Sequence, residues 1–340
     1  MPTVVFLNDH AFTGEDVRTK ALGGIETATI LLAEELAALG YSVTVYNGNN
    51  GESIDKGVKY RPKAAMHHEN ADIAIASSNT SFLTRLNVKL PIVWQHNRQS
   101  FSKMWKRGEV FALLRVRPVL ITLSNDAFQQ TPKYIPYRSR HIIPHAIETE
   151  FLEDNTISFA EREQAAFFAS RPSRNLDWVI DVWKQYIFPA LPKAKLYICI
   201  PPTATFKFDI DELAAHNIIY KGSIPKKDLR DLINRCRLLL YPGHINETGC
   251  QVALQAIGLG IPIVTCGLGS LKDLVSSDRT GYIETDKKRY GKKAVECLTN
   301  SNCWIQLHRN TLKHDWRKSY RERAHDWNKL IIDQLNINKE

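Results

Sequence analysis

Short apolar runs alternate with helix-compatible stretches along most of the chain. The first run, residues 3–7, is followed by a polar loop, two glycines and a segment whose apolar residues share one helical face up to Gly40. A second run at residues 42–46 completes a strand, glycine loop, helix and strand, which is the first unit of a parallel α/β sheet. Further strands are expected at 72–76, 91–94, 119–123 and 140–143.

The same alternation begins again in the second half. Strands are expected at 166–169, 195–200, 218–220, 238–241 and 261–265, and helices at 176–186, 227–234 and 249–258. Regular apolar spacing lapses between residues 148 and 158, which separates two α/β halves of similar size. A polar tail from about residue 315 to 335 carries an apolar stripe at helical spacing. That stripe must be buried against other parts of the protein.

Composition and charge narrow the class of protein. The chain has 340 residues, 44% apolar and 24% charged, so disordered, collagen-like and coiled-coil proteins are excluded. No apolar run is long enough for a membrane span and no signal-peptide pattern opens the chain, so a cytoplasmic protein is expected. The net charge of +9 favours a polyanionic partner: nucleic acid, anionic lipid or a phosphorylated substrate. The six cysteines form no C-x-x-C pair, so reduced thiols are expected.

The stretch from Tyr241 to Ala256 carries the most chemical information. It runs from the end of an apolar strand through a polar, glycine-containing turn into a helix. Ligands of open α/β sheets bind at the carboxyl ends of strands, and helix N-termini favour phosphate. Glu247 can reach such a ligand, and Gln255 lies about two helical turns on, near the same face. Spacing alone leaves a second interpretation open, in which Glu247 is a favourable charge near the helix start and Gln255 is solvated.

This stretch resembles the E-x7-E motif of the retaining glycosyltransferases of family 4, which have the two-domain GT-B fold. Residues 247–250 resemble the E-T-x-C variety of that motif. The resemblance implies that Glu247 contacts the donor sugar, that Thr248, Gly249 and Cys250 belong to the nucleotide-sugar site, and that position 255 binds the ribose. Gln255 stands where the family has its second Glu. An amide still bonds a hydroxyl, but without charge assistance, so the departure bears on donor affinity or nucleotide choice.

Two motifs of the first half extend the resemblance. Residues 22–26 (LGGIE) resemble the family's G-G-x-E loop, whose backbone approaches the donor diphosphate. Gly23 and Gly24 would permit that approach, because they lack a Cβ. His96 follows an expected strand at a place where the family often has a histidine beside the reacting sugar. Without the resemblance, a lone histidine at a strand end is more often structural.

Three further segments match the family less closely. Residues 169–177 (ASRPSRNLD) resemble its G-R-x-x-x-K stretch, which implies that Arg171 and Arg174 neutralise the diphosphate; the alternative is two solvated arginines. Gly222 lies in a segment that resembles the loop near the base. Residues 144–148 (PHAIE) replace the family's P-N-G-V-D linker and keep only its proline, so no role beyond the domain junction is expected there.

The implied architecture is an α/β GT-B fold of two facing Rossmann-like parallel-sheet domains. The N-terminal acceptor domain is expected at 1–150 and the nucleotide-sugar domain at 151–312. The segment 313–340 resembles the family's C-terminal helix, which packs back on the first domain.

Two other patterns are discounted. Asp209 and Asp211 match D-x-D, a metal-binding signature of the other major glycosyltransferase fold. Acidic residues are also typical of a helix start, which fits the sequence that follows better, so no metal site is expected. The basic run at 287–293 lacks interleaved aromatics, so a solvated face is expected in place of a nucleic-acid site.

The implied function is retaining, metal-independent transfer of a sugar from a nucleotide-diphosphate sugar to a glycan or lipid-linked acceptor, in bacterial surface polysaccharide or lipopolysaccharide synthesis. No cofactor is expected. The alternatives are a non-catalytic nucleotide-sugar-binding protein, a nucleotide-sugar 2-epimerase of the same fold and a nucleic-acid binder. The family takes acceptor contacts from N-terminal loops, here 8–21 and 99–110. The second loop mixes aromatic and cationic residues, which suits peripheral contact with an anionic membrane on its cytoplasmic face or a phosphorylated glycolipid. An ordinary helix with Phe101, Met104 and Trp105 packed inward fits the same residues.

Overall fold

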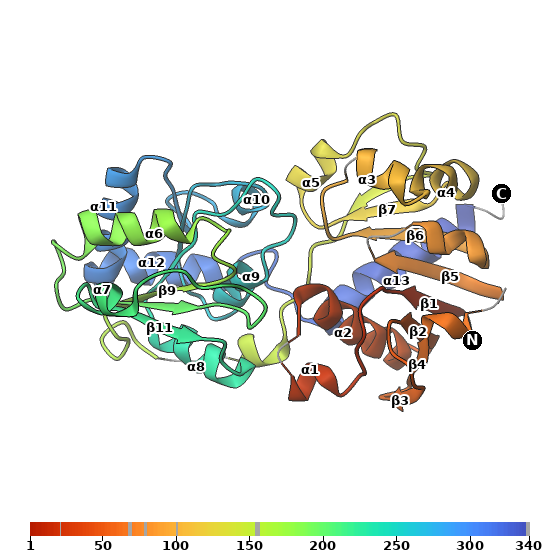
Figure 1. The fold of residues 1–340 in the computed structure, drawn as a ribbon, viewed down its shortest axis with the longest axis horizontal. Helices are drawn as coiled ribbons and strands as arrows, with labels where there is room; N and C mark the ends of the chain where they lie inside the picture. The colour runs from red at the N-terminus through yellow and green to blue at the C-terminus, as the bar shows by residue number, and fades with distance from the viewer. Residues whose placement is uncertain (21, 67–69, 78–79, 100, 154–156, 338–340) are drawn as a thin grey trace. The chain divides into compact units, whose positions relative to one another are not determined.

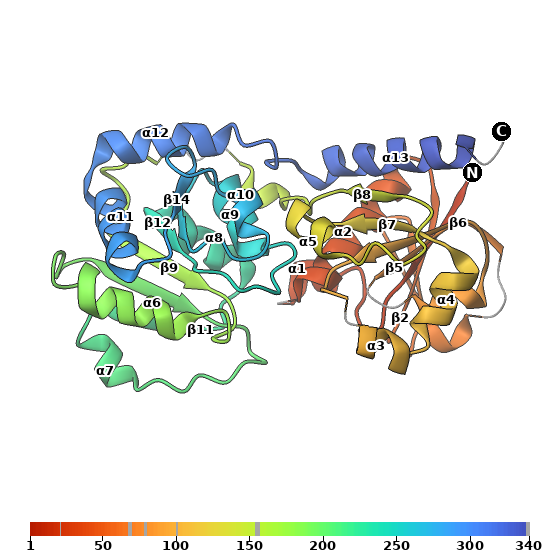
Figure 2. The same cartoon turned by 90° about the horizontal axis from the view of Figure 1, so that it is seen from above.

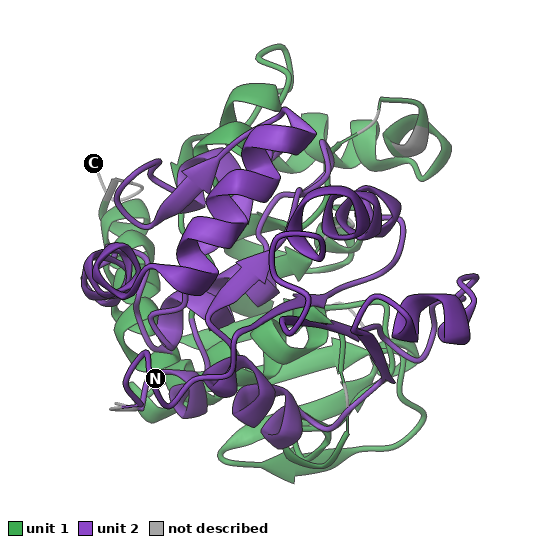
Figure 3. Ribbon diagram, turned by 90° about the vertical axis from the view of Figure 1, so that its left-hand side faces the viewer, with its two compact units in different colours: residues 1–146, 320–340 green, residues 147–319 purple. Residues whose placement is uncertain are grey.

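The protein consists of two compact units, residues 1–146 with 320–340 and residues 147–319 (Figure 3). The computed structural model describes residues 1–20, 22–66, 70–77, 80–99, 101–153 and 157–337. Ala21 and Ser100, which belong to the expected acceptor loops, lie outside the described residues.

Unit 1 is built on an eight-stranded sheet in the order β3-β4-β2-β1-β5-β6-β7-β8 (Figure 1). All neighbouring strands are parallel except β3 and β4. The central strands are covered on both faces, which explains why their sequences are continuous apolar runs. The strands are β1 (Thr3–Leu7), β2 (Ser42–Asn47), β3 (Ser53–Asp55), β4 (Val58–Pro62), β5 (Asn70–Ser77), β6 (Asn87–Gln95), β7 (Val119–Thr122) and β8 (Arg140–Ile142).

The hairpin of β3 and β4 was not expected from the apolar pattern. Both strands are short and carry exposed residues. Lys56 and Gly57, which connect them, both have positive φ values, 43° and 78°. This is the backbone of a type I′ turn, and it matches the twist of a two-stranded hairpin.

The helices of unit 1 include one from the far end of the chain. Helix α13 (Tyr320–Ile337) packs against α2 (Gly24–Ala38) and β6 (Figure 2). Ala324, Trp327 and Ile331 are buried in the same core as the sheet, so the apolar stripe of the tail is buried within unit 1. The other helices are α1 (Asp16–Thr19), η1 (Lys63–Ala65), η2 (Ser81–Arg85), α3 (Phe101–Lys106), α4 (Glu109–Val116) and α5 (Asn125–Gln130).

Unit 2 has a six-stranded, all-parallel sheet in the order β11-β10-β9-β12-β13-β14. Its strands are β9 (Ala165–Ala169), β10 (Lys195–Cys199), β11 (Ile218–Gly222), β12 (Leu238–Leu240), β13 (Ile263–Thr265) and β14 (Gly281–Ile283). Its helices are η3 (Thr149–Phe151), α6 (Leu176–Val182), η4 (Trp183–Ile187), α7 (Ile210–Ala214), α8 (Lys226–Arg235), α9 (Gln251–Gly258), α10 (Leu271–Leu274), α11 (Lys287–Thr299) and α12 (Ser301–Leu312). The two parallel-sheet α/β units are consistent with the expected GT-B fold class.

The boundaries of the units differ by a few residues from those that the sequence suggests. Residues 147–150 and 313–319 belong to unit 2. The physical reason lies at Ile147, whose side chain is fully buried in the core of unit 2. Its backbone N–H donates to the carbonyl of Lys318 at 2.9 Å, so the two crossing segments are tied together inside that unit.

Candidate functional site

The strand order of unit 2 identifies one edge of its sheet as a ligand site. Chain order runs outward from β9 through β10 on one side and from β12 through β13 on the other. Ligands of such sheets bind outside the carboxyl ends of the strands where this order reverses. Here the loops that leave β9 and β12 meet at that edge, because the two strands are parallel neighbours. Arg171, Arg174 and Glu247 lie on these loops.

The two loops are joined by a side chain that the sequence did not single out. Asn175, the residue before α6, has a left-handed backbone with φ +64°. Its amide nitrogen donates to the carbonyl oxygen of Gly243 at 2.6 Å. Asparagine tolerates this conformation better than most residues do. The contact therefore holds the arginine-bearing loop against the loop that carries Glu247.

Glu247 is held by a tyrosine and an arginine. The Tyr241 hydroxyl donates to Glu247 Oε2 at 3.0 Å, and Arg174 Nε lies 3.5 Å from the same oxygen. Burial and the neighbouring Cys250 and Glu247 raise the pKa of Tyr241 well above its usual value, so this hydroxyl stays protonated and donates. Ser170 Oγ lies 3.2 Å from the Tyr241 hydroxyl. The other carboxylate oxygen, Oε1, accepts no hydrogen bond from the described residues.

Glycines allow the backbone around Glu247 to pack closely. Gly269 has φ +61°, and a Cβ there would lie 2.5 Å from the carbonyl oxygen of Glu247. The next residue, Ser270, donates its backbone N–H to that same carbonyl at 2.8 Å. Gly243 has φ +86°, and a Cβ on it would lie 2.3 Å from Leu271 Cδ1. The position of Glu247 thus depends on backbone conformations that favour glycine.

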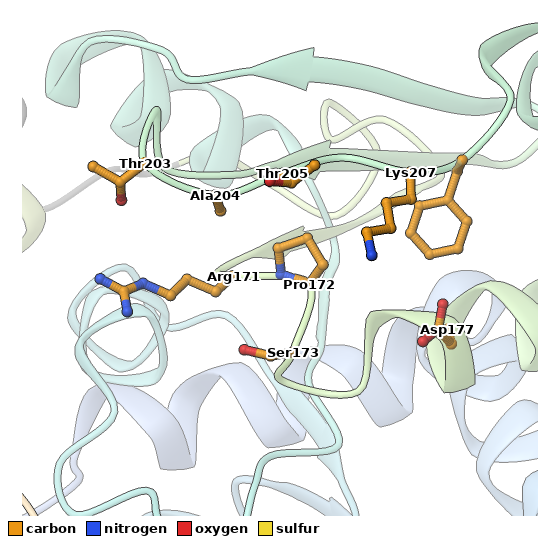
Figure 4. Close-up of a pocket in the computed structure, with 9 residues that line it drawn as sticks. Arg171, Pro172, Ser173, Asp177, Thr203, Ala204, Thr205 and Lys207 are labelled. Atoms are coloured by element: carbon orange, nitrogen blue, oxygen red, sulfur yellow. The ribbon is translucent and has the colours of Figure 1, made fainter.

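A pocket of about 670 Å³ opens beside Arg171, between the loop after β9 and the loop after β10. Arg171, Pro172 and Ser173 line one wall, and Thr203, Ala204 and Thr205 lie across from them (Figure 4). Lys207, Phe208 and Asp177 complete the lining. The pocket offers two cations, several hydroxyl groups and an aromatic ring, which suits an anionic ligand with an attached ring system.

Gln255 is buried and hydrogen-bonded within unit 2. Its amide nitrogen donates to Glu148 Oε2 at 3.2 Å, and Glu148 Oε1 lies 3.2 Å from Lys226 Nζ. The interpretation of Gln255 as a solvated residue is therefore wrong, because only 7% of its surface is exposed. Glu148, expected only to mark the domain junction, also contacts the residue in the second motif position.

The remaining expected site residues of unit 2 are Thr248, Gly249, Cys250 and Gly222. Thr248 and Cys250 are buried between Glu247 and α9, and burial raises the pKa of the Cys250 thiol, which therefore stays neutral. Gly249 lies between them, and the helix that follows begins at Gln251. Gly222 ends β11 with φ +63°. Its carbonyl oxygen accepts from the backbone of Ile200, at the start of the loop that lines the pocket.

In unit 1, Gly23 and Gly24 lie at the start of α2. A Cβ on Gly23 would lie 2.4 Å from Glu26 Oε2, whereas a Cβ on Gly24 would meet nothing within 4 Å. Glu26 also pairs with His10 Nδ1. In this chain the missing Cβ of Gly23 accommodates the carboxylate of Glu26.

His96 follows β6 and belongs to a buried aromatic cluster. Its ring lies 4.4 Å from that of Trp94 and stacks at 5.1 Å on that of His145, measured between ring centroids. Burial and the neighbouring His145 lower the pKa of His96 well below its usual value. Burial and Arg323 lower the pKa of His145 to about 3. Both rings are therefore neutral at physiological pH.

The D-x-D sequence is part of a helix start. Asp209 caps α7, and its side chain accepts from the backbone N–H groups of Asp211 and Glu212. Within the described ranges, no group of three or more His, Cys, Asp or Glu side chains is arranged to hold a metal ion. The basic run begins α11, where Lys287 pairs with Asp181 at 2.9 Å.

The structure brings Arg174 and Glu247 into contact and places Arg171 on the same loop as Arg174. Gly23, Gly24 and His96 lie in unit 1. Sequence reasoning missed Tyr241, although it stands inside the motif at the end of β12. It also missed Asn175 and the pair of Glu148 with Lys226. No local signal marks Asn175, Glu148 or Lys226, because their partners lie 68, 107 or more than 70 positions away in the chain.

Comparison with known proteins supports a ligand site at the carboxyl ends of the unit 2 strands. Residues 163–300 match the model of the domain described as Glycosyl transferases group 1. No curated protein matches the chain. No described helix is long and apolar enough to cross a membrane.

Solved glycosyltransferase structures share the fold over the whole chain. WaaG, a glycosyltransferase involved in lipopolysaccharide biosynthesis, matches with a TM-score of 0.70 and 15% identity, over 96% of this chain and 99% of that one. Anabaena Alr3699/HepE in complex with UDP and glucose matches with a TM-score of 0.72 and 15% identity, over 98% of this chain and 100% of that one. AviGT4, a glycosyltransferase involved in avilamycin A biosynthesis, matches with a TM-score of 0.69 and 15% identity, over 99% of this chain and 98% of that one. At these identities the likeness shows the GT-B fold alone.

Proposed function

We propose that this protein is a retaining glycosyltransferase of the family 4 type, which transfers a sugar from a nucleotide-diphosphate sugar to a glycan or lipid-linked acceptor. The observation that carries the proposal is the contact of Glu247 with Tyr241 and Arg174 at the carboxyl edge of the unit 2 sheet. This group lies inside the segment that matches the group 1 glycosyltransferase domain. The structure of HepE with UDP and glucose supports a uridine diphosphate sugar as the first donor to test.

The donor diphosphate would bind to the loop that carries Arg171 and Arg174. Guanidinium groups bind phosphate oxygens through paired hydrogen bonds. The backbone N–H groups at the start of α9, just beyond Glu247, add a favourable dipole. The pocket beside Arg171 would hold part of the nucleotide. The family resemblance implies that Gln255 contacts the ribose and that Gly222 lies near the base, although neither residue lines this pocket. The same resemblance implies a diphosphate contact for Gly23 and Gly24.

Glu247 would position the donor sugar. Its Oε2 is occupied by Tyr241 and Arg174, while Oε1 is available to accept from a sugar hydroxyl. A carboxylate that is already bound to a donor and a cation is a weaker nucleophile, which favours a positioning role. We therefore propose same-face attack, in which the leaving phosphate accepts the proton of the acceptor hydroxyl. The family resemblance implies a sugar contact for His96, whose ring is neutral.

Charge stabilisation in this proposal comes from protein groups. As the bond from the anomeric carbon to the phosphate oxygen breaks, negative charge grows on the diphosphate. Arg171, Arg174 and the α9 N-terminus face that charge in place of a divalent ion. Metal independence is thus part of the proposal, and transfer in the presence of a chelator tests it.

The acceptor would bind near an exposed aromatic patch on unit 1, formed by Phe101, Trp105, Phe111 and Leu114. Between 53% and 65% of each side chain surface is exposed, and the Trp105 ring lies 5.7 Å from that of Phe111. The inward-packed alternative is wrong for Phe101 and Trp105, and holds only for Met104. Exposed Lys106 and Arg107 flank the patch. Aromatic and cationic groups together suit the cytoplasmic surface of an anionic membrane that carries a lipid-linked acceptor, as in lipopolysaccharide or surface polysaccharide synthesis.

Thermal stabilisation by UDP-, GDP- and ADP-sugars, followed by assays of donor hydrolysis and transfer, tests the function. Arg171→Ala and Glu247→Ala should each lower transfer about 10²- to 10³-fold, the range found for single groups that stabilise developing charge. Lys287→Ala, on the exposed face of α11, is the matched control and should leave transfer unchanged. Wild-type rates in both site variants would contradict the proposal.

A second candidate function is favoured by one observation. Gln255 replaces a charged ribose contact, so the protein could bind nucleotide sugars without turning them over. Stabilisation by a donor without hydrolysis or transfer would support this alternative.

A further inference from the structure

Gln255 is part of a row of three polar side chains in unit 2, of which Gln255 and Glu148 are buried and Lys226 is half-buried. The amide nitrogen of Gln255 donates to Glu148 Oε2 at 3.2 Å, and Glu148 Oε1 lies 3.2 Å from Lys226 Nζ. The exposed fractions of Glu148 and Gln255 are 4% and 7%. The three residues come from the segment before η3, from α8 and from α9, so the row exists only in the folded unit.

The row determines which way the amide of Gln255 points. A carboxylate that is paired with an ammonium group only accepts hydrogen bonds, so the NH₂ group of Gln255 must face it. The carbonyl oxygen, Oε1, is then directed away from Glu148. It accepts no hydrogen bond from any described residue, although the side chain is more than nine-tenths buried. The oxygen is not among the fully buried polar atoms of the described residues, so a ligand that donates a proton can reach it.

We propose that Glu148 is a positioning residue for the nucleotide: it holds the Gln255 amide so that the carbonyl oxygen accepts from a ribose hydroxyl. This inference rests on the proposed function, in which position 255 binds the ribose. It also explains the departure from the second Glu of the motif. A glutamate at 255 would place two carboxylates where polar atoms are now 3.2 Å apart, and their repulsion would disfavour both.

The experiment compares a ribonucleotide with its deoxy forms. Calorimetry gives the Kd of UDP, GDP and ADP for the wild-type protein, and then of the 2′-deoxy and 3′-deoxy forms of the nucleotide that binds best. One deoxy form should bind about 2- to 10-fold more weakly, as expected for one lost hydrogen bond. The same measurements follow on Glu148→Gln, Gln255→Glu and the double variant. Asp181→Asn removes an exposed carboxylate that pairs with Lys287 at 2.9 Å and serves as the control.

Glu148→Gln should bring the ratio of deoxy to ribo Kd close to one, because a neutral amide at 148 no longer selects one orientation at 255. Gln255→Glu should weaken ribonucleotide binding, and the double variant should recover both affinity and ratio, because the carboxylate and amide have exchanged places. A purely structural contact would change the melting temperature but not this ratio.

The outcomes separate the two levels of the proposal. If the nucleotide binds but the ratio of deoxy to ribo Kd is the same in the wild type and in Glu148→Gln, the inference is overturned and the proposed function stands. Failure of the double variant to exceed Gln255→Glu also overturns the inference. No binding of UDP, GDP or ADP by the wild-type protein overturns the proposed function, and the inference with it.

Discussion

Tyr241 donates its hydroxyl proton to the carboxylate of Glu247 at 3.0 Å, six residues along the same loop. The tyrosine is buried at the end of β12, so its hydroxyl is fixed by packing. It therefore directs the carboxylate toward the edge of the sheet where the arginine-bearing loop lies. Tyr241 can thus fix the orientation of Glu247 without contacting the ligand itself.

Tyr241→Phe should release Glu247. We expect donor binding to weaken about 2- to 10-fold and the free energy of unfolding to fall by about 1 kcal/mol, because one hydrogen bond is lost. Calorimetric titration with the donor and chemical denaturation measure the two effects. Tyr290→Phe is a matched control, because its buried hydroxyl donates to the Val264 carbonyl at 2.6 Å. The control should lose stability and keep donor affinity; equal losses of affinity in both variants would argue against a specific role.

Gly269→Ala should displace the loop that carries Glu247. The new Cβ would lie 2.5 Å from the Glu247 carbonyl oxygen, and the backbone has φ +61°. A side chain in this conformation costs about 1–3 kcal/mol, measurable by denaturation, and donor binding should fall as well. Gly51→Ala, where a Cβ meets nothing within 4 Å, should be close to neutral. A fully stable Gly269→Ala protein with normal donor affinity would contradict this account.

Stability should fall as the pH is lowered from about 6.5 toward about 3. His145 has its pKa lowered to about 3 in the folded protein by burial and Arg323, and the pKa of His96 is also lowered. In this window the unfolded chain binds protons that the folded chain does not, so unfolding is favoured by up to about 1.4 kcal/mol per pH unit for each histidine. The melting temperature as a function of pH measures the effect. His145→Gln should flatten the curve, and an unchanged slope in that variant would show that other groups control it.

Cys303 should be the most reactive thiol of the protein near neutral pH. A hydrogen bond with Cys297 contributes most to lowering the pKa of Cys303 to about 7, and the Tyr282 hydroxyl lies 3.2 Å from its sulfur. Burial raises the pKa of Cys250. Mass spectrometry after brief alkylation should find Cys303 modified first, with half-maximal rate near pH 7. Tyr282→Phe should shift that midpoint upward, and preferential labelling of Cys250 would refute the prediction.

The aromatic patch on α3 and α4 should mediate binding to anionic membranes. Trp105→Ser combined with Phe111→Ser should reduce co-sedimentation with vesicles that contain phosphatidylglycerol, and high salt should reduce it further. Ile54→Ser, at an exposed apolar residue on β3, is the control. Unchanged sedimentation of the double variant would remove the membrane from the proposal while leaving the donor site intact.

The sequence by itself was sufficient for features that depend on local patterns. The apolar runs predicted β1, β5, β6 and β7 within a few residues, because strands covered on both faces must be apolar throughout. The motif around Glu247 and the arginines 171 and 174 could be identified because loops at strand ends carry the chemistry of α/β proteins. The hairpin of β3 and β4 and the short strand β14 were missed, because three to five residues carry too little periodicity.

Only the tertiary structure decided which side chains hold the site. Asn175 and Gly243 are 68 residues apart, and Glu148 and Gln255 are 107 apart, yet each pair shares a hydrogen bond. The first contact arises from the strand order, which brings the ends of β9 and β12 together, and the second from the packing of α9 against η3. The same holds for the burial of Gln255 and the stacking of His96 on His145. Periodicity and spacing report on neighbours along the chain, whereas these interactions depend on neighbours in space.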